Sequence, residues 1–149
     1  MNCKIRRMTL RDYAAVHRLW MQTEGMSLTG DDNREGIALY LRRNRGLCFI
    51  ASSGNRLIGT VLCGHDGRRG ILRHLAVRKE FRKQGIALRL VQKSLTALAG
   101  QGIQKCNLYV MDYNVTGLRF WKHIGFHLIA DDYRTLQIGT GAFAPYKTR

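Results

Sequence analysis

The fold of this chain is decided by the stretch ILRHLAVRKEFRKQGIA, which covers residues 71–87. Its first part, Ile71–Val77, is the compact apolar run of a β-strand. Its last residues open a helix whose apolar side chains recur on one face: Ala87, Leu88, Leu90, Val91, Leu95 and Leu98. A charged turn between a strand and a helix leaves backbone N–H groups unpaired at the helix start, where the helix dipole favours an anion. The stretch therefore predicts a phosphate or pyrophosphate site in this turn.

The residues of the turn suit such a site. Gly85 lets the backbone approach a ligand closely, and Ala87 is too small to obstruct it. Arg82 and Lys83 add positive charge at the same place. The predicted cradle consists of Arg82, Lys83, Gln84, Gly85, Ile86 and Ala87. The pattern R-x-x-G-x-A alone matches many unrelated chains, so its place between a strand and an amphipathic helix carries the prediction.

The residues before this stretch predict a strand, two helices and a hairpin. A strand is expected over residues 4–8, and Thr9 and Asp12 have the spacing of a capping box at the first helix. Asp31 or Asp32 is expected to cap the second helix, whose apolar positions are Ile37, Leu39, Tyr40 and Leu41. Turn residues 53–55 separate apolar runs at 47–51 and 57–63, which is typical of an antiparallel hairpin.

The residues after this stretch predict further alternating elements. The central helix is expected to end near Gly100 or Gly102. Then follow a strand at 106–110, a helix at about 115–124, and strands at 126–130 and about 135–138. We therefore expect one α/β domain over residues 1–149, with a mixed sheet of about six or seven strands and helices on both faces. Residues from about 140 to 149 are expected to form a loosely attached tail.

Composition narrows the class of protein. The chain has 149 residues, 45% of them apolar, which is enough for one buried core. Four separated cysteines without a C-x-x-C pair indicate reduced core residues, and neither a disulfide framework nor a metal site is expected. No apolar run spans a bilayer and the N-terminus lacks the apolar stretch of a signal peptide, so we expect a cytoplasmic protein without membrane contact. The net charge of +15 attracts anions, nucleic acid among them.

A second motif, NVTGLRFWKHIGF, lies at residues 114–126. With it the chain resembles the GCN5-related N-acetyltransferase (GNAT) family. That family's central signature is a strand ending in L-A-V, followed by [QR]-x-x-G-x-[GA] at a helix start. Its later signature is N-x-x-[AG]-x-x-F-[YW]-x-x-x-G-F. Both signatures occur here in order, and the expected elements match the GNAT fold along nearly the whole chain.

The resemblance implies a co-substrate and its binding residues. Acetyl-CoA would donate its acetyl group directly to an amine in a ternary complex, without a metal. Backbone groups of Leu75, Ala76 and Val77 would line the pantetheine arm in a splay between two parallel strands. Residues 82–87 would cradle the pyrophosphate, and Asn114 would hydrogen-bond the co-substrate near the arm. The sulfur would then lie close to the start of the helix at 115–124.

The general acid departs from the family pattern. Many family members have a tyrosine where this chain has Trp121, and an indole N–H does not give up a proton near neutral pH. Trp121 packs either against acetyl-CoA or in the core. Tyr113 is our candidate acid; Tyr109 and an unassisted thiolate are the alternatives.

The general base also departs from the pattern, because Arg73 and His74 stand where relatives often carry an acidic residue. Strand alternation would put Arg73 and Leu75 on one face and His74 and Ala76 on the other. An imidazole suits base duty near neutral pH, which makes His74 the candidate base. His65, Glu24 and Glu35 are the other candidates.

The acceptor is an unidentified amine, on a small molecule or on a peptide or protein. One alternative is a basic nucleic-acid-binding module, suggested by the charge and by the run Arg42–Arg45. Against this alternative, the sequence has no RNP-like aromatic pattern, no zinc-ligand spacing and no heptad repeat. A second alternative is a family member that binds acyl-CoA without catalysis. The sequence is also compatible with a homodimer.

Overall fold

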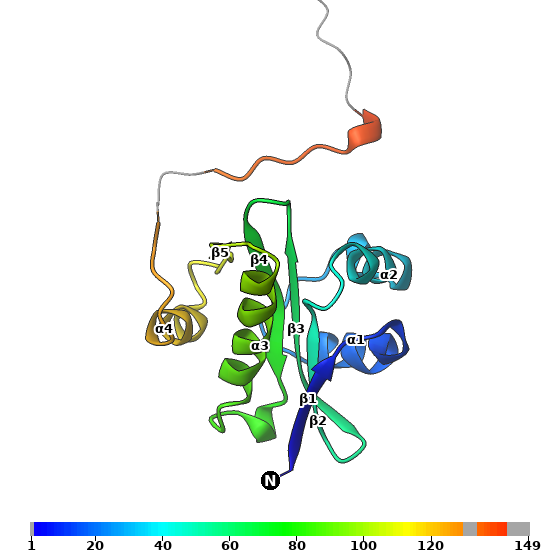
Figure 1. The fold of residues 1–149 in the computed structure, drawn as a ribbon, viewed down its shortest axis with the longest axis vertical. Coiled ribbons are helices and arrows are strands. Elements are labelled where there is room, and N and C mark those ends of the chain that lie inside the picture. The colour runs from blue at the N-terminus through cyan, green and yellow to red at the C-terminus, as the bar shows by residue number, and fades with distance from the viewer. Residues whose placement is uncertain (1, 130–133, 143–149) are drawn as a thin grey trace, which may run out of the picture. The chain divides into compact units, whose positions relative to one another are not determined.

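The computed structural model describes residues 2–129 and 134–142. The chain divides into two units, Met1–Val115 and Thr116–Arg149. The first unit contains the sheet and three of the helices, and it carries most of the predicted site (Figure 1). The second contains the helix of the later motif. Each unit is described in turn.

The first unit is built on a five-stranded mixed sheet. Its strands follow one another in chain order: β1 (Cys3–Arg7), β2 (Phe49–Ser53), β3 (Arg56–His65), β4 (Gly70–Val77) and β5 (Cys106–Asn107). Neighbours from β1 to β4 are antiparallel, and β5 pairs with β4 in parallel. The predicted hairpin and the mixed α/β sheet are confirmed.

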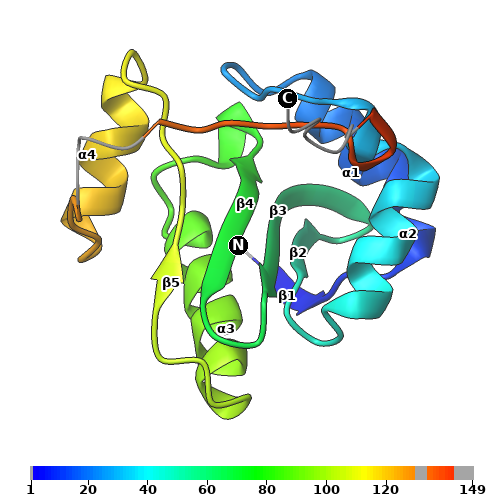
Figure 2. The same ribbon diagram turned by 90° about the horizontal axis from the view of Figure 1, so that it is seen from above.

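Helices cover both faces of the sheet, as predicted. The helices α1 (Tyr13–Met21) and α2 (Arg34–Arg43) lie on one face, and α3 (Ile86–Gly100) lies on the other (Figures 1 and 2). The first face closes over a core that includes Trp20, Ile37 and Leu62, each at most 2% exposed. On the other face Leu90 of α3 lies so close to Gly59 that an added Cβ there would be 3.1 Å from it.

The helix starts follow local capping chemistry. The N–H of Thr9 donates to Asp12 Oδ2 at 2.9 Å, which confirms the first capping box. The second cap was wrongly predicted, because Asn33 caps α2 and accepts from the N–H of Gly36 at 2.7 Å. Asp31 and Asp32 instead form a 3-10 turn, Gly30–Asp32, that has its own capping box with Thr29. This extra turn moves the start of α2 along the chain.

The side chains agree with the sequence in part. All four cysteines are free, and Cys48 and Cys63 are buried as predicted. Leu39 was expected on the apolar face of α2 but is 59% exposed. The helix α3 ends at Gly100, and Gly102 follows with a φ of 81°. Within the described residues no helix has both the length and the apolarity of a bilayer-spanning one.

The second unit contains α4 (Val115–His123) but no further strand among its described residues. Residues 126–129 and the predicted strand at 135–138 lie outside any strand, while residue 130 is outside the described residues. The backbone explains the first difference. The N–H of Phe126 bonds back to Trp121 O at 2.9 Å, and Gly125 has a φ of 109°, so this segment closes the helix. A 3-10 turn at Thr140–Ala142 precedes residues 143–149, which are outside the described residues.

Candidate active site at the bulge of strand β4

Strand β4 contains one extra residue in the middle of the site. Its pairing with β3 passes from Thr60–Ala76 to Leu62–Arg73, so two steps along β3 match three along β4. His74 lies in this bulge with a φ of 50°, which is uncommon for a residue with a side chain. Such strain persists only where surrounding contacts compensate it.

A buried chain of hydrogen bonds holds the bulge. The indole N–H of Trp20 donates to Thr60 Oγ1 at 3.0 Å, and Thr60 Oγ1 donates to His74 O at 3.1 Å. Thr60 is completely buried and Trp20 is 1% exposed. The bridge therefore fixes the backbone of His74 to helix α1 and strand β3.

The alternation predicted for β4 is wrong for Arg73 because of the bulge, whereas His74 and Ala76 share a face as predicted. Arg73 pairs with Leu62, whose side chain belongs to the core under α1 and α2. Paired residues of antiparallel strands share a face, so Arg73 faces α1 and α2. His74 faces the same side, since its ring meets the Trp20 ring edge-on at 4.8 Å. Two consecutive residues thus lie on one face of the sheet.

The imidazole of His74 is paired with a carboxylate. His74 Nε2 lies 2.7 Å from Asp32 Oδ1, and the two side chains are 15% and 14% exposed. Asp32 is fixed in turn, because its Oδ2 accepts from the N–H of Thr29 at 2.9 Å and its carbonyl accepts from the Tyr13 hydroxyl at 2.8 Å. Within the described residues His74 Nδ1 has no partner. A carboxylate at Nε2 favours the tautomer with the proton on Nε2, which leaves a lone pair on Nδ1.

The strands β4 and β5 separate next to the bulge. They pair only at Gly70–Cys106 and Ile71–Asn107. The predicted strand at 106–110 was therefore too long. From Leu72 to Val77 no described strand pairs with the β5 side of β4, so the stretch Leu75, Ala76 and Val77 lies at a free edge. The pairing of the two parallel strands thus ends before the stretch that the resemblance assigned to the pantetheine arm.

The turn after β4 has the features of an anion site. Lys83 and Gly85 have φ values of 60° and 76°, and Gly85 is the N-cap of α3. Backbone of this kind directs successive N–H groups into one concave surface. The first backbone bond of α3 from this region is Arg89 N–H to Gly85 O at 3.1 Å. Within the described residues the N–H groups of 83–88 donate to no backbone carbonyl, and this leaves them for a phosphate.

The residues of the turn have different roles. Arg82 Nε donates to Val77 O at 2.9 Å, so this guanidinium ties the turn to the end of β4. Ile86 is 2% exposed, so its side chain belongs to the core. Lack of space does not require a glycine at position 85, because an added Cβ would meet nothing within 4 Å. The backbone φ of 76° is what favours glycine there. Lys83, Gln84 and Ala87 are not buried.

The other predicted site residues lie on the segment after β5 and in the second unit. Tyr113 and Tyr109 are 74% and 76% exposed. The N–H of Asn114 donates to Met111 O at 2.8 Å, just before α4. The Trp121 ring lies edge-on to Phe120 at 5.1 Å and to Phe126 at 5.0 Å, so it packs within the second unit.

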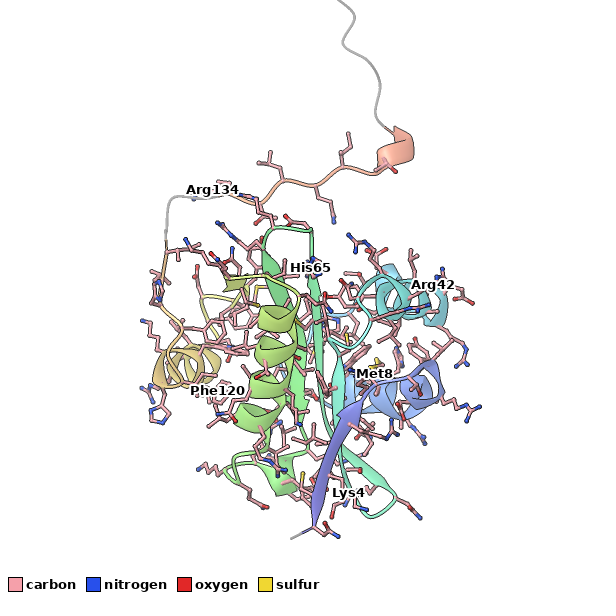
Figure 3. All side chains as sticks on the ribbon, viewed as in Figure 1. Lys4, Met8, Arg42, His65, Phe120 and Arg134 are labelled. Carbon is pink, nitrogen blue, oxygen red and sulfur yellow. The ribbon has the colours of Figure 1, made fainter. Side chains whose placement is uncertain are left out.

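The other candidate bases are placed less favourably. Figure 3 shows His65 at the end of β3, beside the turn that leads to β4. Both of its ring nitrogens are occupied: Nε2 lies 2.9 Å from Gln101 Oε1, and Nδ1 accepts from the N–H of Gly67 at 2.9 Å. Glu24 is exposed, with its carboxylate 3.9 Å from Lys79 Nζ. Glu35 is exposed on the first turn of α2.

Sequence reasoning missed Asp32 and Thr60 as site residues. Asp32 was weighed only as a helix cap, and it lies 42 positions from His74 along the chain. The sequence pattern identified Thr60 only as a strand residue. Neither has a local pattern that could have identified it, because both act through contacts between distant segments.

Comparison with known proteins agrees with this geometry. Residues 13–126 match the model of the Acetyltransferase (GNAT) family. The chain is 36% identical to N-alpha-acetyltransferase 30 of Schizosaccharomyces pombe over 100 residues, which are 64% of this chain and 67% of that protein.

Solved structures share the fold. The PaiA N-acetyltransferase of Thermoplasma acidophilum in complex with coenzyme A has a TM-score of 0.77 at 20% identity, covering 89% of this chain and 94% of that one. The NatC complex bound to Gag peptide and CoA contains a chain with a TM-score of 0.72 at 21% identity, covering 85% of this chain and 86% of that one. These structures share the fold, and the bulge, the splay and the free N–H groups at the start of α3 agree with it. The match of residues 13–126 to the family model, with the relation to an N-alpha-acetyltransferase, shows that the chain belongs to the GNAT family and is an acetyl-CoA-dependent N-acetyltransferase.

Proposed function

We propose that the chain acetylates the N-terminal amine of a peptide or protein, with His74 as the general base and Asp32 as its orienting partner. The observation that carries the proposal is the Asp32–His74 pair, which is held at the bulge beside the splay of β4 and β5. The α-amine as acceptor is supported by the relatives, one of which is an N-alpha-acetyltransferase and another a complex with a peptide.

The free edge of β4 supports the placement of the co-substrate. Peptide-like groups of a pantetheine arm can pair with the unpaired backbone of Leu75, Ala76 and Val77. The N–H groups at 84–87 and the positive end of α3 attract the pyrophosphate, and the exposed Lys83 adds charge. Asn114, the first residue of the motif at 114–126, precedes α4 and is assigned to the pantetheine arm.

The His74–Asp32 pair then has a defined task. An N-terminal amine is largely protonated near neutral pH and must lose a proton before it attacks. His74 Nδ1 takes this proton, while Asp32 holds the Nε2 proton and stabilises the positive ring. After His74 has passed this first proton to solvent, the neutral amine nitrogen forms the C–N bond to the acetyl carbon, the C–S bond breaks, and its electron pair leaves with the thiolate. The nitrogen then gives its second proton to His74 Nδ1, which leaves the neutral amide.

Tyr113 is assigned to protonate the thiolate. Replacement by phenylalanine tests this assignment, with Tyr109→Phe as the matched variant on the same segment. A lower kcat in Tyr113→Phe alone supports Tyr113 as the acid. Equal rates in both variants mean that the thiolate leaves unassisted.

The acceptor class is tested by measuring thiol release from acetyl-CoA with three sets of compounds. The first set has free N-terminal amines, the second has the same peptides with blocked N-termini and a lysine, and the third contains polyamines and small amines. We expect turnover in the first set, with the acetyl group located on the α-amine by mass spectrometry. Turnover confined to blocked peptides or small amines would contradict the proposal.

A further inference from the structure

A pocket of about 320 Å³ lies on the α1–α2 side of the sheet, and its lining includes Arg73, the residue before the candidate base. Helix α2, the hairpin end of β3 and β4, and the end of β5 with the segment that follows it contribute to its walls. The lining includes Tyr40, Gly64, Arg69, Arg73, Asn107 and Tyr109. None of them has a role in the chemistry described above, except that Tyr109 is an alternative acid.

The strand pairing places this pocket next to His74. Ile71 pairs with Gly64, Arg73 pairs with Leu62, and Leu62 belongs to the core under α1 and α2. The lining part of β4 therefore ends at Arg73, one residue before His74 and on the same face. Ile71 and Asn107, the last pair before the splay, also line the pocket. An acceptor whose amine meets His74 thus has its next groups over this pocket.

The charges of the pocket are unbalanced. Within the described residues the guanidinium groups of Arg69 and Arg73 have no ion pair or hydrogen bond, whereas Arg6 is paired with Asp12. The one carboxylate among the lining residues, Asp66, turns Oδ1 to the N–H groups of Arg68 and Arg69 at 2.8 Å each. Two arginines and one aspartate leave one excess positive charge.

An unsatisfied donor lies in the same wall. The Tyr40 hydroxyl is buried and has no hydrogen-bond partner among the described residues. Burial raises the pKa of Tyr40 well above its usual value and outweighs the opposite effect of Arg73, so the hydroxyl stays a donor. Gly64 makes room for it, because a Cβ there would lie 2.7 Å from the hydroxyl oxygen. Buried polar groups are normally satisfied, and a ligand acceptor would satisfy this one.

We propose that this pocket binds a carboxylate of the acceptor through Arg73, Arg69 and the Tyr40 hydroxyl. The inference rests on the proposed peptide acceptor and narrows it to acceptors that carry an acidic group close to the reacting amine. A guanidinium matches a carboxylate with two parallel hydrogen bonds, and a tyrosine hydroxyl adds a third. The carboxylate comes either from an acidic side chain near the N-terminus or from the C-terminus of a very short peptide.

The test compares kcat/KM for matched peptides that differ only in Glu or Gln at the second or third residue, all with amidated C-termini. Tripeptides with a free or an amidated C-terminus form the second arm. We expect a preference on the order of tenfold for the acidic member of one arm, expressed mainly in KM. The arm that shows it identifies the source of the carboxylate. Equal values in both arms overturn the inference.

Variants assign the preference to the pocket. Arg73→Gln should abolish most of the Glu-over-Gln ratio, and Arg69→Gln and Tyr40→Phe should reduce it. Arg68→Gln is the matched control, because Arg68 lies in the same turn but does not line the pocket. A ratio that Arg73→Gln leaves unchanged refutes the assignment. Acetyl-CoA affinity and thermal melting establish that each variant is folded. If a variant does not fold, the Glu-over-Gln ratio of kcat/KM in the wild-type protein still tests the inference.

Failure of the two proposals can be told apart. If no free N-terminal peptide of any sequence is acetylated, the peptide acceptor is wrong. If Glu and Gln peptides are acetylated equally well, the acceptor class stands and only the carboxylate pocket is wrong.

Discussion

Replacing Asp32 by asparagine removes the charge beside His74 and keeps the size of the side chain. We expect the variant to bind acetyl-CoA normally and to react more slowly. The amide can still accept from His74 Nε2, but it no longer stabilises a positive ring. In the wild type, the N–H of Thr29 donates to Asp32 Oδ2 at 2.9 Å. In the variant, the amide NH₂ of the asparagine takes the place of this oxygen and cannot accept. Loss of this cap should lower the free energy of unfolding by about 1 kcal/mol.

The size of the rate effect follows from the geometry of the pair. His74 Nε2 and Asp32 Oδ1 are 2.7 Å apart, and the side chains are only 15% and 14% exposed. Unit charges about 4 Å apart attract by about 4 kcal/mol at an effective dielectric constant of about 20. Residual solvent screening and partial proton transfer at the transition state leave about half of this, or about 2 kcal/mol, which is about a thirtyfold loss of kcat. Loss of the base itself in His74→Gln should cost about 10²- to 10⁴-fold.

The assay is the initial rate of thiol release at saturating acetyl-CoA with the best peptide from the acceptor screen. Asp31→Asn is the matched control, because Asp31 lies in the same turn, is exposed and does not contact His74. Calorimetric titration with acetyl-CoA separates a catalytic effect from a loss of co-substrate binding. A wild-type rate in Asp32→Asn, or in His74→Gln, would refute the assignment of the pair.

Three further predictions concern Gly85, the Thr60 bridge and the Arg6–Asp12 pair. Gly85→Ala forces a side chain onto a φ of 76° and should lower the free energy of unfolding by about 1–2 kcal/mol and weaken acetyl-CoA binding in calorimetry, whereas Gly100→Ala, at an ordinary helix position, should do neither. Thr60→Val leaves a buried indole N–H unpaired, so urea unfolding should show a loss of about 1–3 kcal/mol and kcat should fall as the bulge loosens; an unchanged kcat would mean that the bridge does not position the base. Burial alone would raise the pKa of Asp12, but hydrogen bonds from Arg6 and the Thr9 N–H lower it. These bonds therefore stabilise the folded state at neutral pH, and this stabilisation is lost as the pH falls through the folded-state pKa. The difference in the free energy of unfolding between wild type and Arg6→Gln, about 1 kcal/mol at most, should vanish when melting is measured in acid.

The strand, turn and helix around Gly85 could be predicted from the sequence. A strand, a charged turn with Gly85 and an amphipathic helix each have their own local pattern, and the structure places them as expected. The same holds for the capping box at Thr9 and the hairpin of β2 and β3. These features depend on residues within a few positions of one another, so a sequence pattern contains all of their causes.

Features that depend on distant contacts could not be read in this way. The alternation predicted for β4 failed at Arg73, because the bulge is fixed by the Trp20–Thr60 bridge and has no turn residue to mark it. The apolar run at 106–110 looked like a long strand, yet it pairs with β4 over two residues only. The partner of His74 lies in a 3-10 turn that the pattern had assigned to the start of α2.

The single extra residue of β4 links the two halves of the proposed site. In a regular strand, consecutive side chains point to opposite faces, so a residue next to Arg73 would face α3. The bulge instead puts His74 on the same side as Arg73, toward Trp20 and Asp32. It also lies where pairing between β4 and β5 has ended, which frees the edge that the pantetheine arm requires. One inserted position therefore places the proposed base on the face of the proposed acceptor pocket and lies next to the edge proposed for the acetyl donor, which gives the φ of 50° at His74 a functional reason under both proposals.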